Sequence, residues 1–163
     1  MDSGNIGFVL LCAAFVFVMT PGLAMFYGGL VRKKNVVNTM MTSIFIIGIG
    51  IVMWVLFGYS LSFAPSGNAF IGDFRWLGLE GVSLTEGYTD DASIPNMVFS
   101  AFQMMFAVIT PALITGAVAG RMKFKSIFVF TIFWSLIVYY PLAHMVWGQG
   151  GLLGADGIGA LDF

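Results

Sequence analysis

Residues 31–63 read VRKKNVVNTMMTSIFIIGIGIVMWVLFGYSLSF, in which three consecutive cations precede a long run without a charged side chain. A helix that spans a bilayer needs about 20 predominantly apolar residues. The uncharged run extends over residues 35–72, and three further uncharged stretches occupy residues 3–31, 92–120 and 126–155. The sequence therefore predicts an all-α membrane protein with four transmembrane helices.

The charges are segregated along the chain. Six of the seven cations fall in two clusters, at residues 32–34 and 121–125, and all eight acids lie elsewhere. Four crossings would place both cationic clusters on one side, with the N-terminus, an outer loop (64–93) and an outer tail (148–163) on the other. Cationic loops stay on the cytoplasmic side of a membrane. We therefore predict a multi-pass cell-membrane protein whose N-terminus is extracellular or periplasmic.

The expected spans cover about residues 6–31, 38–63, 94–120 and 126–147 of a single domain, 1–163. Ser93, followed by Pro95, is typical of a helix start and predicts the beginning of the third span. In the second span, Gly48, Gly50 and Gly58 are expected to let neighbouring helices approach closely. The tail carries six glycines before Asp162 and Phe163, a pattern that suggests a chain cut short.

Composition argues against several classes of function. The chain is 59% hydrophobic and 9% charged, whereas soluble proteins average about 25% charged residues. Basic patches with interleaved aromatics do not occur outside the two cationic clusters, so nucleic-acid binding is not expected. His144 is the single histidine and the predicted spans contain no carboxylate, so neither an enzyme nor a metal or cofactor site is predicted. We expect His144 to be a hydrogen-bonded structural residue near the outer end of the fourth span. Cys12, also single, is expected to pack as a small apolar residue.

The third span carries a stripe of large apolar residues at three- and four-residue steps, namely Phe99, Phe102, Phe106, Ile109 and Leu113. Such a stripe is typical of helix packing. Alternatively, Phe102 and Phe106 line a narrow passage in which their ring faces attract a small cation. The sequence leaves both interpretations open.

Two residues near the predicted outer surface also have two interpretations each. Trp147 suits the aromatic belt at the lipid headgroups, and it equally suits recognition of a cation by its ring face. Asp162 would either cap a following helix or add a negative field at the surface.

Four stretches resemble the ammonium transporter (Amt/Mep/Rh) family, and its Amt/Mep branch in particular. They are PGLAMFYGGLVRKKNV (21–36), FQMMFAVIT (102–110), AHMVWGQGG (143–151) and GALDF (159–163). The resemblance implies a homotrimer whose subunits each have eleven spans in two inverted repeats, and a chain that is the N-terminal portion of such a subunit. It also implies a cytoplasmic nitrogen-regulatory signalling protein as a partner.

The resemblance assigns roles to four residues. Phe106 would be the outer gate phenylalanine, Phe102 its neighbour in the vestibule, Trp147 the recruitment-site tryptophan and Asp162 the acid beneath that site. The implied function is transport of ammonium or ammonia by recruitment at an outer aromatic site, deprotonation and passage through an apolar pore. The family's pore histidines and second gate phenylalanine have no counterpart in this chain, and His144 does not replace them.

Two alternatives remain at this point. The same module could serve as the ammonium-sensing part of a receptor, because the family also resembles parts of sensory proteins. A four-helix membrane anchor of a redox enzyme, with His144 as a haem ligand, is the alternative from another functional class.

Overall fold

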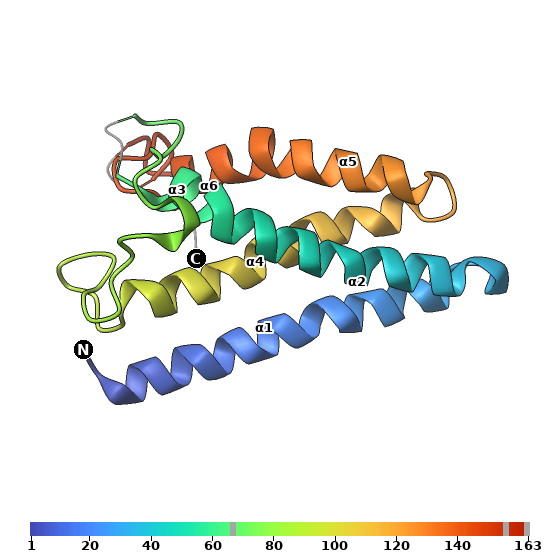
Figure 1. The fold of residues 1–163 in the computed structure, drawn as a ribbon, viewed down its shortest axis with the longest axis horizontal. Helices are drawn as coiled ribbons and strands as arrows, with labels where there is room; N and C mark the ends of the chain where they lie inside the picture. The colour runs from blue at the N-terminus through green and yellow to red at the C-terminus, as the bar shows by residue number, and fades with distance from the viewer. Residues whose placement is uncertain (66–67, 155–156, 162–163) are drawn as a thin grey trace. The chain divides into compact units, whose positions relative to one another are not determined.

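The computed structural model describes residues 1–65, 68–154 and 157–161, which form helices, turns and loops and contain no strand. The α-helices are α1 (Ser3–Leu30), α2 (Val36–Met53), α3 (Tyr59–Phe63), α4 (Asn96–Val118), α5 (Phe124–Trp134) and α6 (Tyr140–Trp147) (Figure 1). Two π-helical turns, Trp54–Gly58 and Ser135–Tyr139, connect α2 to α3 and α5 to α6.

Among the described residues, four helical stretches are long and apolar enough to cross a membrane, namely Ser3–Leu30, Lys33–Phe63, Asn96–Val118 and Phe124–Trp147. The predicted all-α class with four transmembrane helices is thereby confirmed. The chain divides into two compact units, the first formed by residues 1–51 and 82–131 and the second by residues 52–81 and 132–163.

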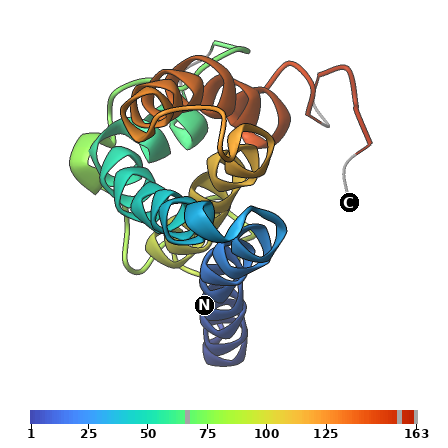
Figure 2. The same cartoon turned by 90° about the vertical axis from the view of Figure 1, so that its right-hand side faces the viewer.

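In the first unit, α1 packs along α4, as the view along the helices shows (Figure 2). The Asp2 carboxylate caps α1 by accepting a hydrogen bond from the Gly4 N–H at 3.0 Å. The buried residues of α1 are all small, namely Ala13, Thr20, Ala24 and Gly28. Small side chains allow close helix contact where lipid removes the hydrophobic driving force. Near the end of α1, the Tyr27 hydroxyl donates a hydrogen bond to the Leu113 carbonyl of α4 at 3.0 Å.

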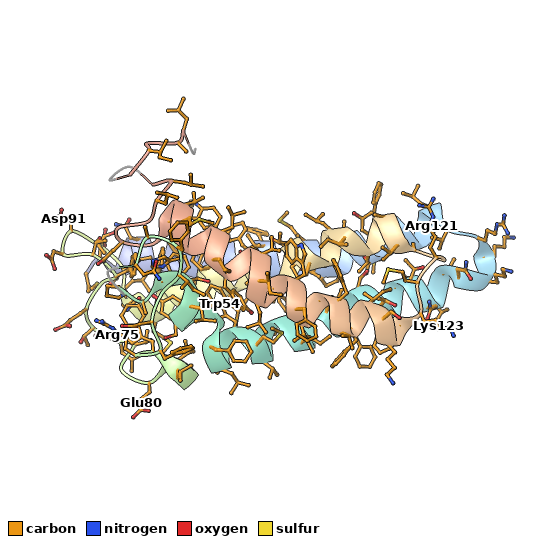
Figure 3. The ribbon with its side chains drawn as sticks, turned by 90° about the horizontal axis from the view of Figure 1, so that it is seen from above. Trp54, Arg75, Glu80, Asp91, Arg121 and Lys123 are labelled. Atoms are coloured by element: carbon orange, nitrogen blue, oxygen red, sulfur yellow. The ribbon has the colours of Figure 1, made fainter. Side chains whose placement is uncertain are left out.

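The two cationic turns of the first unit lie at the same end of its helices (Figure 1). Arg121 and Lys123 occupy this end, whereas Asp91 lies at the opposite end (Figure 3). The N-terminus is also at the opposite end, where the Asp2 N–H donates to the Ser93 carbonyl at 2.9 Å. The charge segregation predicted from the sequence is therefore present within this unit.

The predicted helix start at Ser93 is wrong. Helix α4 begins at Asn96, and its N-cap is Pro95 with φ −61° and ψ 148°. The Pro95 carbonyl accepts the first helical hydrogen bond, from the Phe99 N–H at 3.0 Å. Proline suits this position because its fixed φ fits the helix and its missing N–H needs no partner.

Of the three glycines of the second span that were expected to allow close helix packing, two do so. A Cβ atom on Gly50 would lie 3.0 Å from the Val108 side chain, and one on Gly58 would lie 2.7 Å from the Tyr140 ring. At Gly48, by contrast, a Cβ would meet no atom within 4 Å. Gly48 is exposed, so its smallness is not used for packing.

The second unit is built around buried aromatic rings. Trp54, Tyr59, Phe63 and Tyr140 are each at most 1% exposed, and the Trp54 and Tyr140 ring centroids lie 6.0 Å apart. The π-helical turn before Pro141 lets the Tyr140 N–H donate to the Ser135 carbonyl, five residues earlier. A wider turn accommodates a proline ring that would otherwise clash with a carbonyl of the preceding turn. The helix therefore continues through Pro141 to its end.

A loop of the second unit folds back on the end of α3. The Gly72 N–H donates to the Leu61 carbonyl at 2.7 Å, and the Ser60 hydroxyl donates to the Asp73 carbonyl at 2.8 Å. Further along this loop, the Asp73 carboxylate and the Arg75 guanidinium form an exposed ion pair at 2.7 Å. The hydrogen bond from Arg75 lowers the pKa of Asp73, because it stabilises the ionised carboxylate.

Candidate functional site

Phe102 and Phe106 lie one turn apart on α4, in the first unit. Their ring centroids are 5.1 Å apart and their planes are 84° apart, so the pair is T-shaped. Both residues are half-buried. In a T-shaped pair the edge of one ring meets the face of the other, which leaves further ring face for other partners. One turn further along α4, the Thr110 hydroxyl donates a hydrogen bond to the Phe106 carbonyl at 2.6 Å.

The other members of the predicted stripe have different environments. Phe99 stacks on Tyr88 with centroids 4.9 Å apart and planes 6° apart, which is a packing role. Ile109 is buried, whereas Leu113 is 49% exposed. The packing interpretation is thus confirmed for Phe99 and Ile109, and the half-buried Phe102 and Phe106 remain candidates for a passage.

Trp147 is the last residue of α6, in the second unit, and its side chain is 43% exposed. This exposure leaves part of the indole available to lipid or to a cation. Asp162 lies outside the described residues. Of the four predicted site residues, the structure therefore brings Phe102 and Phe106 into contact and places Trp147 in the other unit.

His144 lies one turn before Trp147 and is completely buried. Its Nδ1 is 3.0 Å from the Ser62 carbonyl oxygen, and its Nε2 is 2.9 Å from the Asn68 carbonyl oxygen. These contacts confirm the hydrogen-bonded structural role that the sequence predicts for His144. The haem-anchor alternative needs a ring nitrogen that is available to iron, and here both nitrogens face carbonyl oxygens.

A polar recess in the first unit was not predicted from the sequence. The recess is small and partly open to the surroundings, and it lies at the end that carries the cationic turns. Its polar lining comes from Asn38, Thr39 and Thr42 of α2 and Thr115 of α4. Thr115 also shares a hydrogen bond with Ser43 at 3.0 Å. The signal in the sequence is the polar run at the start of an otherwise apolar span.

Comparisons with known proteins identify a single protein family. The sequence matches the family model described as Ammonium Transporter Family over residues 7–163. It is 50% identical to an ammonium transporter of Bacillus subtilis (strain 168), covering 100% of this chain and 39% of the relative. It is 42% identical to an ammonium transporter of Aquifex aeolicus (strain VF5), covering 100% of this chain and 38% of the relative.

Solved structures give the same result. The crystal structure of Candida albicans Mep2 matches with a TM-score of 0.86 and 30% identity, covering 100% of this chain and 35% of that one. The crystal structure of Saccharomyces cerevisiae Mep2 matches with a TM-score of 0.83 and 34% identity, covering 94% of this chain and 36% of that one. The chain thus spans little more than a third of the length of the proteins it matches.

Proposed function

Because this chain belongs to the Ammonium Transporter Family, we propose that the intact protein carries ammonium or ammonia across a membrane and that this chain supplies part of the outer side of its pathway. The match over residues 7–163 carries the proposal. The four apolar helices support it, because they make the chain a multi-pass membrane protein. In this proposal ammonium is recruited by Trp147, Phe106 and Phe102, with Asp162 contributing negative charge.

The aromatic residues are suited to bind a small cation without trapping it. A cation over an aromatic face gains about 0.5–2 kcal/mol. The partly exposed Trp147 and the half-buried Phe102 and Phe106 offer such faces. Three contacts would therefore supply only a few kcal/mol, which favours brief occupancy of the site. The proposal requires Trp147 and Phe106 to face the same entrance in the intact protein.

These binding free energies are too small to carry a charged ammonium ion through an apolar pore, which argues that ammonium loses a proton before it enters. Transfer of an isolated ammonium-sized charge into an apolar medium costs tens of kcal/mol by Born solvation, and a few ring contacts do not offset that. A neutral amine avoids this penalty, since no charge enters the apolar pore. Potassium has no proton to give up, so it pays the full penalty and is rejected. Selectivity then rests on deprotonation as well as on fit.

The proposal includes an orientation and an assembly. The cationic turns face the cytoplasm, because positive loops are retained there. The N-terminus and the aromatic end of the pathway then face the outside. The intact protein forms a homotrimer in a cell membrane, and a cytoplasmic nitrogen-regulatory signalling protein meets the cationic side.

A change at Trp147 tests the recruitment role. In the intact protein, Trp147→Leu removes the aromatic face and keeps an apolar side chain. We expect uptake of labelled methylammonium to fall several-fold at low concentration and to approach the wild-type rate at high concentration, because a lost cation–π contact weakens binding of the cation.

Two further variants serve as controls for this test. Trp147→Phe keeps a ring and should stay near the wild-type concentration dependence. Phe133→Leu removes another aromatic residue of the same span that is 58% exposed, and it should have little effect. If Trp147→Leu leaves the concentration dependence unchanged, Trp147 does not recruit the cation.

A further inference from the structure

The ring of His144 is enclosed on several sides. Besides the two carbonyl contacts, Gly148 packs directly against it, since a Cβ on Gly148 would lie 2.6 Å from Nδ1. The ring is completely buried, so bulk water does not reach it. Its hydrogen-bonding groups must therefore be satisfied by the protein.

The two contacts require more protons than a neutral ring carries. A carbonyl oxygen only accepts hydrogen bonds, so each nitrogen that faces one must donate. A neutral imidazole has one N–H and one bare nitrogen, whereas the imidazolium has two N–H groups. With 3.0 Å at Nδ1 and 2.9 Å at Nε2, only the imidazolium satisfies both contacts. In a neutral ring, one nitrogen lone pair would face an oxygen lone pair in a buried site.

Helix ends favour a positive charge at this position. Ser62 lies in the last turn of α3, and His144 lies in the last turn of α6. The carbonyl groups at a helix C-terminus carry a partial negative charge that stabilises a nearby histidine cation. The charged side chains among the described residues of this unit are Asp73, Arg75 and Glu80. Asp73 and Arg75 pair with each other, so the two carbonyls and the helix ends are the main stabilising groups for His144.

We propose that His144 carries both ring protons in the folded protein and thereby positions Trp147. The doubly donating ring ties the last turn of α6 to the backbone at Ser62 and Asn68. Trp147 follows one turn later, so the same two hydrogen bonds fix the position of its indole ring. The positioning role rests on the proposed recruitment of a cation by Trp147, whereas the protonation of the ring does not.

The protonation is tested directly by nitrogen NMR on the intact protein with ¹⁵N-labelled histidine. The His144 signals are identified as those that disappear in His144→Gln. At pH 7 we expect two nitrogen signals of the protonated type, each coupled to a hydrogen. A single protonated signal together with the far-shifted signal of a bare nitrogen would overturn the proposal. This measurement needs no transport activity, so it stands whether or not the proposed function holds.

The positioning role is tested by uptake of methylammonium. Glutamine at position 144 can donate toward only one side, so His144→Gln releases one of the two carbonyls. We expect the half-saturating concentration to rise about fivefold, as for a weak coupling between two groups, with maximal uptake much less changed. Adding Trp147→Leu should then cause little further rise, because both changes act on the same contact. A fall in maximal uptake alone, or independent effects of the two changes, would contradict the positioning role.

Discussion

Gly72→Ala is expected to lower the free energy of unfolding of the intact protein by about 3 kcal/mol, the largest effect among the single substitutions considered. A Cβ on Gly72 would overlap the Ser60 carbonyl oxygen and lie 2.9 Å and 3.0 Å from the carbonyl oxygens of Leu61 and Ala64. These atoms are backbone at the end of α3, so they cannot rotate away. The loop would have to move off the helix instead.

That movement would break several contacts at once. The Gly72 N–H to Leu61 carbonyl bond, at 2.7 Å, would be lost directly. The Ser60 hydroxyl also accepts a hydrogen bond from the Trp76 N–H at 3.0 Å, and the Trp76 ring stacks on Tyr59 with centroids 5.4 Å apart. These contacts depend on the same loop path, and they should weaken together.

Thermal unfolding in detergent, followed by tryptophan fluorescence, measures the Gly72 effect. Gly48→Ala is the matched control, because Gly48 is exposed in a helix and a Cβ there meets no atom within 4 Å. Alanine in a helix interior is favoured over glycine by about 0.5–1 kcal/mol, so the control should be neutral or slightly stabilising. Equal melting of the Gly72 and Gly48 variants would show that the loop does not pack as described.

Gly58→Ala is expected to destabilise the protein by about 2 kcal/mol, with the opposite sign to the Gly48 control. The new methyl group would lie 2.7 Å from Cζ and 2.8 Å from the hydroxyl oxygen of Tyr140. A surface tyrosine could rotate away, but Tyr140 is 1% exposed and is held by neighbouring rings. Interiors packed this closely do not admit an added methyl group without strain.

Removal of the opposing ring supplies the diagnostic control for Gly58. In a Tyr140→Leu background the clash is relieved, so Gly58→Ala should lose most of its effect in the same unfolding measurement. The two substitutions are therefore expected to be strongly non-additive. Additive effects would place the cause of destabilisation in the backbone of the π-helical turn rather than at the Tyr140 ring.

Features that depend on composition along the chain could be predicted from the sequence. The four helices follow from long uncharged runs, and the segregation of charge follows from clusters such as that at Arg121. These signals are strong because the membrane penalises every buried charge and every unsatisfied backbone group. The structural role of His144 was also predicted, although its two partners were not.

Features that depend on tertiary contacts could not be predicted. Ser93 has good capping chemistry, yet its carbonyl accepts a hydrogen bond from the Asp2 N–H, and Pro95, two residues later, is the N-cap residue of α4 instead. Gly48 and Gly50 look alike in sequence, and only the neighbouring helix decides which of them is in contact. The π-helical turns leave no clear pattern, because they reflect how Tyr140 packs on Gly58 and how Pro141 is accommodated. For the same reason, sequence alone leaves open which aromatic residues of α4 are free to meet a ligand.

We propose that the cationic turns face the cytoplasm and that the opposite end of the helices faces the outside, and two-sided cysteine labelling tests this orientation most directly. In a cysteine-free background of the intact protein, Lys33→Cys marks the first cationic turn, and Leu84→Cys marks the loop before α4, where Leu84 is 72% exposed. A membrane-impermeant maleimide should label position 84 in intact cells and position 33 only after permeabilisation. Labelling of position 33 in intact cells, with position 84 protected until permeabilisation, would contradict this orientation.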